Sequence, residues 1–320
     1  MTRVPPATAE VRRAVRRILP DVGSGPVLVA CSGGADSLAL AAAAAFLVDE
    51  VHAVVVDHGL QAGSDVVAAG VRDRLGTLGI VAVVAPVAVE RRSGPEADAR
   101  SARYAALRVT SDGLGGAPVL LGHTLDDQAE TVLLGLGRGS GARSLSGMRT
   151  WDPPWCRPLL GVRRATTRAA CVEAGLEPWD DPHNADPRYT RVRLRHEVLP
   201  LLEDVLAGGV APALVRTAAQ LADDDAALTD LAEDLRREAS DDDGGLAAPV
   251  VGKAPAAVRR RVLRAWLVAR GVRGADDAQL RAVDDLVARW HGQGPSSLPG
   301  GLEVIRTRGR LSVRSAPTAT

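Results

Sequence analysis

The chain has 320 residues, of which 46 % are hydrophobic and 24 % are charged, and its formal net charge is +0. This length is enough for two domains, and the composition is ordinary for a globular protein. The balanced charge gives no global argument for a polyanionic partner, although arginine supplies nearly all the positive charge because Lys253 is the only lysine.

The sequence lacks the usual signals of membrane insertion and of secretion. No stretch reaches the roughly 18–20 uncharged apolar residues that a membrane span needs, and the N-terminus has no apolar segment typical of a secretory signal. Cys31, Cys156 and Cys171 form no CxxC pair, which predicts reduced thiols rather than a disulfide framework. We therefore expect a cytoplasmic protein with no membrane partner.

Apolar runs and helical spacings alternate along the first part of the chain. After a helix over 7–19, the pattern predicts strands at 27–31, 51–56, 80–85 and 118–121, each followed by a helix, at 37–48, 64–78, 95–111 and 124–136. Each strand is a continuous apolar run, as is typical of parallel strands covered on both faces. We predict an open parallel-sheet α/β domain, in which ligands bind beyond the carboxyl ends of the strands.

The pattern changes after this domain. Residues 137–158 are rich in Gly, Ser, Arg and Pro and predict a long loop, followed by helices near 163–175 and 190–205. Two glycines near residue 208 predict a boundary between a catalytic domain over 1–207 and a second region over 208–320. That region is predicted to contain a linker helix and a smaller, mainly helical C-terminal domain, with helices near 255–270 and 276–290 and a hairpin at 302–305 and 310–314.

The strongest chemical signal is CSGGADS, residues 31–37, between the first strand and its helix. Adjacent glycines let the backbone N–H groups approach an anion, Ser32 and Ser37 add hydroxyls, and the helix presents its positive end. Asp36 repels phosphate unless it holds Mg²⁺ against it. The alternative is a Gly-Gly turn with Asp36 as the helix N-cap. No Gly-Lys-Ser/Thr of a Walker A loop is present, and the string predicts a different nucleotide-binding loop.

A second motif, GHTLDDQAET over residues 122–131, follows the fourth predicted strand and opens a helix. His123, Asp127 and Glu130 are spaced by four and three residues, which brings them near one another in a helical turn. Thr124 and Asp127 alone also fit a capping box, but that interpretation does not explain His123 or Glu130. Two acids and a histidine at the end of a strand predict a catalytic role.

Both motifs carry a family resemblance. SGGADS resembles the PP-loop signature of ATP-pyrophosphatases, which cleave ATP to AMP and pyrophosphate while adenylating a substrate. GHTLDDQAET is similar to a motif of the tRNA(Ile)-lysidine synthetase family. Further matching segments are VDHGL (56–60), EADARSARY (96–104), RGSG (138–141), GM (147–148), RPLL (157–160), WDDP (179–182) with Asn184, YTRVRLR (189–195) and LP (199–200). The resemblance covers roughly residues 25–205. Val192 departs from it, because the family commonly has asparagine there.

The resemblance implies an adenine nucleotide α-hydrolase-like fold and a ligase that uses ATP and Mg²⁺. ATP adenylates the oxygen on carbon-2 of the wobble cytidine in tRNA(Ile) with a CAU anticodon. The ε-amine of free L-lysine then displaces AMP and gives lysidine. Partners are therefore the tRNA and lysine, and a homodimer is an open option. Neutralising the amine at pH 7 costs ~4.6 kcal/mol, so a base or a desolvating pocket is needed. His123, Asp127 and Glu130 are available, with their roles undivided.

The motifs and the resemblance together give a candidate site. The ATP-binding candidates are Ser32, Gly33, Gly34, Ala35, Asp36, Ser37, Val56 and Gly122. The catalytic candidates are Asp36, His123, Asp127, Glu130 and Arg195, and the Mg²⁺ ligands are Asp36 and Asp127. The candidates for binding tRNA or phosphate are Arg100, Arg103, Arg138 and Arg191.

Several alternatives stay open at this level. For the arginines of the run 188–195, and for Arg259, Arg260, Arg261 and Arg264 in the C-terminal domain, contact with tRNA competes with a purely structural role. A tRNA thiolation enzyme is disfavoured because such enzymes usually need closely spaced cysteines. A passive nucleotide- or RNA-binding protein does not need the clustered acids, and a small-molecule amidotransferase does not need the arginine run.

Overall fold

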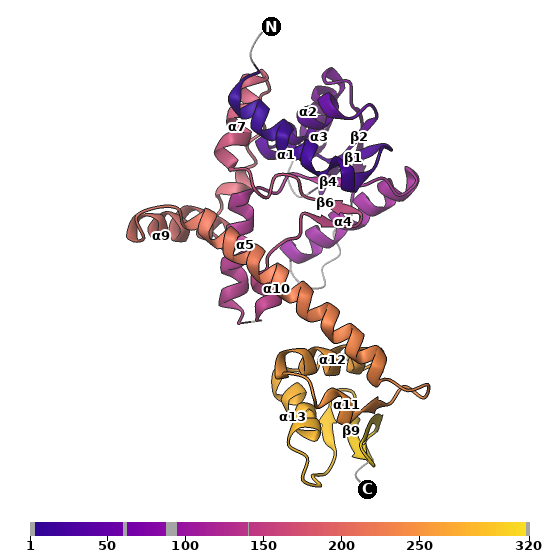
Figure 1. The fold of residues 1–320 in the computed structure, drawn as a ribbon. Helices are drawn as coiled ribbons and strands as arrows, with labels where there is room; N and C mark the ends of the chain where they lie inside the picture. The colour runs from indigo at the N-terminus through magenta and orange to yellow at the C-terminus, as the bar shows by residue number, and fades with distance from the viewer. Residues whose placement is uncertain (1–3, 60–62, 88–94, 140, 318–320) are drawn as a thin grey trace. The chain divides into compact units, whose positions relative to one another are not determined.

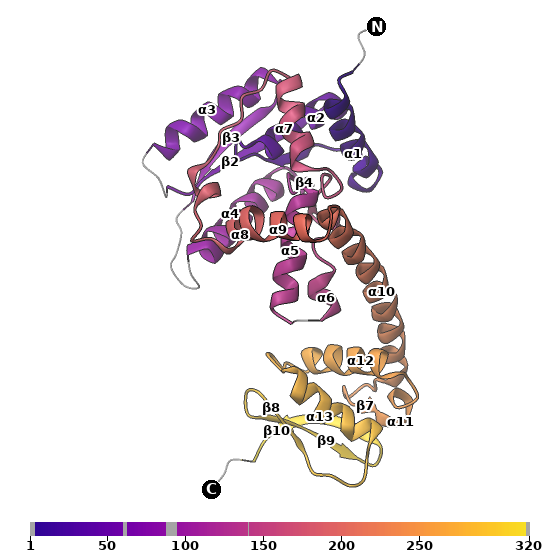
Figure 2. The same ribbon diagram turned by 90° about the vertical axis from the view of Figure 1, so that its left-hand side faces the viewer.

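The computed structural model describes residues 4–59, 63–87, 95–139 and 141–317 and divides into two units, Met1–Ala219 and Gln220–Thr320 (Figures 1 and 2). The division falls within helix α10 (Val210–Ala239). Leu60 and Ser140, in two of the segments that carry the resemblance, lie outside the described residues.

The first unit is built on a mostly parallel sheet, as predicted. Its strands are β1 (Val27–Ala30), β2 (Val51–Asp57), β3 (Val81–Pro86), β4 (Val119–Leu121), β5 (Trp151–Asp152) and β6 (Trp155–Cys156). They lie in the order β3-β2-β1-β4-β6-β5, and every neighbouring pair is parallel except the edge strand β5, which is antiparallel to β6. Because parallel strands share one carboxyl edge, the loops after β1, β2 and β4 meet there.

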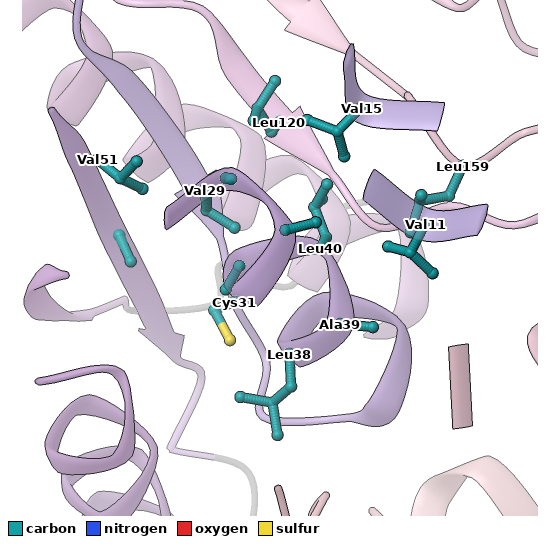
Figure 3. Packing of buried hydrophobic residues seen from close by; sticks show 14 of the residues in the cluster. Val11, Val15, Val29, Cys31, Leu38, Ala39, Leu40, Val51, Leu120 and Leu159 are labelled. Atoms are coloured by element: carbon teal, nitrogen blue, oxygen red, sulfur yellow. The ribbon is translucent and has the colours of Figure 1, made fainter. Parts of the chain in front are cut away.

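Helices cover both faces of this sheet. They are α1 (Pro6–Val22), α2 (Ala35–Leu47), α3 (Ser64–Thr77), α4 (Pro95–Gly113) and α7 (Arg164–Glu173), whereas α5 (Leu125–Gly137) packs in a separate cluster with Leu199 and Ala211. Val27 and Val29 of β1 pack with α1, α2, α3 and α7 in one hydrophobic cluster (Figure 3), whereas Leu28 and Ala30 pack against α4 in another. Successive strand residues face opposite sides, so burial of both faces explains the unbroken apolar run.

The prediction of one long loop over 137–158 is wrong. This segment contains α6 (Ala142–Leu145) and the two short strands β5 and β6. A strand of two residues has no measurable periodicity, and β6 exists because it pairs with β4 across the sheet. A 3₁₀ turn, Pro182–Ala185, precedes the predicted helix 190–205. That helix is divided into α8 (Thr190–Arg193), a π-helical turn (Leu194–Val198) and α9 (Leu199–Val205).

The C-terminal region is helical only in part, because it also contains a small antiparallel sheet. After α10 come α11 (Ala248–Val251), α12 (Ala256–Ala269) and α13 (Asp277–Ala288), which pack with a four-stranded antiparallel sheet. Its order is β7 (Leu246–Ala247), β10 (Arg310–Ser315), β9 (Leu302–Thr307) and β8 (Ser296–Leu298). The predicted hairpin is β9–β10, and the strands added at its two edges have only two and three residues.

Among the described residues, no single helix is both long enough and apolar enough to cross a membrane. One pair of successive helices, Thr190–Val205 and Val210–Ala239, satisfies these criteria only when the two are counted together, and it is bent by 95°.

Candidate active site

The loop between β1 and α2 has a conformation that only glycine adopts easily. Gly33 has a φ of +84°, and a Cβ there would collide with Val71 of α3. The Ser37 hydroxyl donates to the Gly34 carbonyl (2.9 Å) and accepts from the Ser32 N–H (3.2 Å). The loop is therefore closed against the first turn of α2.

Asp36 does not cap helix α2. Gly34 is the N-cap residue, without a side-chain cap, and Asp36 lies in the first turn. One Asp36 oxygen accepts a hydrogen bond from the Thr167 hydroxyl, and the other lies 3.5 Å from Arg164 Nε. Burial raises the pKa of the Asp36 carboxyl, and the contacts with Thr167 and Arg164 oppose that rise. The capping alternative for Asp36 is thus wrong, because its carboxylate faces α7.

The second motif lies directly against this loop. A Cβ on Gly122 would come within 3.1 Å of backbone atoms of Asp36 and Ser37, so only glycine permits this close approach. Two motifs far apart in sequence therefore share one site at the carboxyl edge of the sheet.

A cavity of about 330 Å³ lies beside the loop. Its lining includes Ser32, Gly34 and Val56, together with residues of α3, Arg103 and Trp179. The Trp179 N–H donates to the Gly33 carbonyl (2.9 Å). Trp179 belongs to a segment that carries the family resemblance, but it was not predicted as a site residue. Its contact with Gly33 joins residues far apart in the sequence, which local sequence patterns do not reveal.

Two polar side chains on the cavity wall have no hydrogen-bonding partner among the residues that the structure describes. Arg103 makes no hydrogen bond or ion pair with another described residue, and burial lowers its pKa. His58 Nδ1 is buried and has no hydrogen-bond partner in the part of the chain that the structure describes. Burial, and then the nearby Arg103 charge, lower the pKa of His58. The cavity therefore presents unused hydrogen-bonding groups.

Arg164, the first residue of α7, connects the two motifs. Its guanidinium lies 2.5 Å from Asp127 Oδ1, 3.5 Å from Glu130 Oε1 and 3.5 Å from Asp36 Oδ2. Arg164 was not among the predicted site residues. Its position was an indication, because a positive side chain at the start of a helix is unfavourable against the helix dipole and is expected to pair with a carboxylate.

Asp127 forms the capping box that the sequence allowed, and its second carboxylate oxygen faces the arginines of the candidate site. Its Oδ2 accepts hydrogen bonds from the N–H and the hydroxyl of Thr124, both at 2.8 Å, in a capping box. Its Oδ1 faces Arg164 and lies 3.5 Å from Arg195. Burial alone would raise the pKa of Asp127, but Arg164 and Thr124 outweigh burial and lower the pKa. The residue therefore caps α5 and also presents a charged oxygen to the site.

Glu130 is fully buried among arginines. Arg195 Nε donates to its Oε1 (2.9 Å), and a terminal nitrogen of Arg195 lies 3.3 Å from Oε2. Arg195 lies in the π-helical turn, a distortion that is frequent at functional sites. Arg191 lies 3.9 Å from Glu130 and donates to Thr131. Glu130 thus holds Arg195 toward Asp127.

His123 is neutral in this environment. Burial, followed by the charge of Arg103, lowers the pKa of His123 to about 3, and its buried Nδ1 has no partner among the described residues. A pKa this low leaves the imidazole uncharged at pH 7.

The remaining predicted arginines divide into separate groups. Arg188 and Arg193 are exposed and pair with Asp186 and Glu197, away from the cluster. Arg100 is exposed over the Tyr104 ring, 4.9 Å from its centroid, and Arg138 is the exposed C-cap of α5. The structure does not bring Arg100 or Arg138 into the cluster. Three C-terminal arginines are held in ion pairs: Arg259 and Arg260 with Asp284, and Arg261 with Asp225.

Comparison with known proteins identifies both regions. A model described as a PP-loop domain matches residues 7–202, and one described as a TilS substrate binding domain matches residues 246–312. The tRNA(Ile)-lysidine synthase of Rhodococcus opacus (strain B4) is 58 % identical over 315 residues, covering 96 % of each chain. The protein of that name from Mycobacterium tuberculosis (strain H37Rv) is 58 % identical over 274 residues, covering 83 % of this chain and 82 % of the relative.

A solved structure shares the fold at much lower identity. The U34-tRNA thiolase NcsA of Methanococcus maripaludis, with its [4Fe-4S] cluster, is 20 % identical with a TM-score of 0.54, covering 67 % of this chain and 79 % of that chain. The PP-loop model matches more than half of the chain, and the closely similar relatives extend over nearly all of it. The chain therefore belongs to the tRNA(Ile)-lysidine synthase family of PP-loop proteins.

Proposed function

We infer that this protein ligates free lysine to carbon-2 of the wobble cytidine in tRNA(Ile) with a CAU anticodon. ATP first adenylates the cytidine and releases pyrophosphate, and lysine then displaces AMP. The observation that carries this inference is the contact of one guanidinium, Arg164, with Asp36 of the PP-loop and with Asp127 and Glu130 of the second motif. A nucleotide at the loop and a reacting group at the acids would therefore lie side by side.

ATP binding is proposed for the cavity and the adjoining loop. Valine side chains and strand-end backbone line the cavity and suit an adenine ring, which needs apolar faces and a few hydrogen bonds. Ser32 and the N-terminus of α2 suit the phosphates. Arg103 and His58, whose polar atoms have no partner among the described residues, suit the ribose or a phosphate.

Asp36 and Asp127 are the residues that would hold Mg²⁺. Both supply carboxylate oxygens, and both already lie against a cation, the Arg164 guanidinium. Their side chains are 25 % and 15 % exposed, so each is accessible from the site. Mg²⁺ commonly binds one or two carboxylates together with substrate phosphates, and it would neutralise charge on the departing pyrophosphate.

The three candidate groups of the second motif can now be given different roles. A pKa of about 3 makes His123 a poor base for an amine whose pKa is about 10.4, so we propose that it orients a substrate by hydrogen bonding. Asp127, charged and accessible, would hold the ε-ammonium of lysine and accept its proton as the amine attacks carbon-2 and AMP leaves. Glu130 acts as a positioning residue for Arg195, which contacts the α-phosphate.

Thiolation is disfavoured by the state of the cysteines. Cys31, Cys156 and Cys171 are all buried. Burial raises the pKa of all three thiols, to about 12 for Cys156 and about 11 for Cys171. Sulfur transfer requires a thiolate, which these surroundings suppress at neutral pH.

The decisive experiment incubates the protein with ATP, radiolabelled lysine and individual tRNAs. Label should enter only isoleucine tRNA with a CAU anticodon, with equimolar release of AMP and pyrophosphate. Asp127→Ala should abolish both, whereas Asp112→Ala, at an exposed position near the end of α4, should behave as wild type. Labelling of other tRNAs, or normal turnover by Asp127→Ala, would refute the assignment.

A further inference from the structure

Helix α1 exposes a dense basic face that the proposed reaction does not use. Val11, Ala14, Val15 and Ile18 are buried against the core. At 100° per residue, the four arginines Arg12, Arg13, Arg16 and Arg17 occupy an arc of about 140° on the opposite side. None of the four forms an ion pair with any carboxylate that the structure describes. We call these four residues the α1 arginine face.

This absence of ion pairs distinguishes the α1 arginine face from several other exposed arginines of the first unit. Arg72, Arg188 and Arg193 are exposed as well, but each lies within 2.8 Å of a carboxylate, on Asp73, Asp186 and Glu197 respectively. Local carboxylates cancel most of the charge at those positions. On α1 the charge of four guanidiniums is instead concentrated within about 8 Å along the helix axis.

A cavity of about 440 Å³ opens beside this face. Arg13 and Arg17 line it together with Thr150 and Val162, and Glu10 is the one acidic residue of its lining. Two guanidiniums against one carboxylate leave the cavity positively charged. Val162 lies two residues before Arg164, so the cavity wall continues directly into the segment that enters the candidate active site.

An exposed aromatic ring borders the same face. Phe46, the only phenylalanine of the chain, is 58 % exposed at the end of α2. The Arg12 guanidinium lies 3.4 Å from its ring centroid. Exposed aromatic rings and guanidinium planes are the groups on which unpaired bases stack in protein–RNA complexes. Phosphate-binding and base-stacking groups therefore occur together here.

We propose that the α1 arginine face and Phe46 bind the tRNA outside its reacting nucleotide. Guanidinium groups grip phosphate oxygens with two parallel hydrogen bonds, so the row of arginines follows the backbone while Phe46 receives an unpaired base. This proposal rests on the proposed function, which makes tRNA the substrate. It adds a binding surface separate from the acids and the PP-loop.

The test compares tRNA binding by wild type, by Arg13→Ala/Arg16→Ala/Arg17→Ala and by a charge-matched control, Arg72→Ala/Arg236→Ala/Arg237→Ala, whose three arginines are each paired with a carboxylate. Binding is measured by fluorescence anisotropy between 50 and 200 mM salt, and thermal unfolding checks the fold. Loss of three phosphate contacts should lower the salt slope by about 2, so wild type should lose about 16-fold more affinity than the α1 variant across this range. The control should keep the wild-type slope.

A second variant separates stacking from charge. Phe46→Leu should weaken tRNA binding about fivefold or more without changing the salt slope, because a stacked base carries no phosphate charge. In ligation assays the α1 variant should raise the KM for tRNA and leave kcat within about twofold of wild type.

The outcomes keep the two proposals apart. If wild type does not ligate lysine to tRNA, the proposed function fails. If wild type ligates but the α1 variant keeps its tRNA affinity, salt slope and KM, the function stands and the α1 proposal is overturned. An equal loss of slope in the control also overturns it, since only overall charge would then matter.

Discussion

Arg164→Ala removes a guanidinium that contacts carboxylates of both sequence motifs. Its nitrogens lie 2.5 Å from Asp127, 3.5 Å from Glu130 and 3.5 Å from Asp36. Breaking a buried ion pair by removing one partner typically costs about 3–5 kcal/mol in the free energy of unfolding. The Arg164 and Asp127 side chains are 20 % and 15 % exposed, and Arg195 remains 3.5 Å from Asp127. We therefore expect a loss at the lower end of that range, about 3 kcal/mol.

The effect on turnover should be of similar size. Removing one preorganised charged donor from an active site typically lowers kcat by about 10²–10³. We expect kcat/KM to fall about 100-fold for Arg164→Ala. Arg164→Lys should recover part of this loss, because an ammonium keeps the charge but cannot reach several carboxylates with a planar fork.

The pH dependence follows from the direction of the pKa shifts. Arg164 holds the pKa of Asp127 below its ordinary value of 3.8, and it opposes the burial that raises the pKa of Asp36. A lowered folded-state pKa contributes stability that is present above the unfolded-state pKa and is lost as pH falls through the folded-state value. The stabilities of wild type and Arg164→Ala should therefore converge below about pH 4. The acid limb of kcat/KM should move to higher pH in the variant, because both carboxylates become easier to protonate.

The assay measures pyrophosphate release with ATP and tRNA(Ile) across pH and Mg²⁺ concentration, with thermal unfolding on the same samples. A purely structural role would lower stability without moving the acid limb. If turnover of Arg164→Ala stays within about threefold of wild type and its acid limb does not move, Arg164 does not position the carboxylates of the two motifs for the reaction.

Three further predictions concern other parts of the molecule. Gly33→Ala should raise the KM for ATP at least about tenfold, because a side chain there is strained at positive φ and collides with Val71. Adding Val71→Ala removes the collision but leaves the backbone strain, so the double variant should recover only part of the ATP affinity. Full recovery would show that backbone strain at Gly33 does not contribute. Replacing all three cysteines with alanine should preserve lysine transfer while lowering thermal stability; loss of transfer in the folded variant would revive sulfur chemistry. Asp284→Ala should destabilise the C-terminal unit by about 3–5 kcal/mol, since the buried carboxylate pairs with Arg259 and Arg260, and an unchanged melting temperature would show these pairs to be dispensable.

Much of the first unit was predictable because its signals are local. Strands β1, β3 and β4 are unbroken apolar runs, and β2 has only His52 within its apolar run. In the second motif, His123, Asp127 and Glu130 lie within about two helical turns of sequence. Local sequence patterns did not predict strands β5, β6, β7 and β8. Each has only two or three residues and forms because it pairs with another strand of its sheet. For Arg259 to Arg261 the sequence left tRNA contact and a structural role open, because their carboxylate partners lie on α13 and α10, far along the chain or on another helix.

The sequence by itself determined the sheet, the PP-loop and the acidic motif, because backbone freedom at glycine, helix polarity and helical spacing act over a few neighbouring residues. Only the tertiary structure decided which charges meet. Arg164, Thr167 and Trp179 join the PP-loop from a later part of the chain, and Arg195 reaches Glu130 through a π-helical turn. Charge pairing depends on distance in space, and chain packing sets that distance.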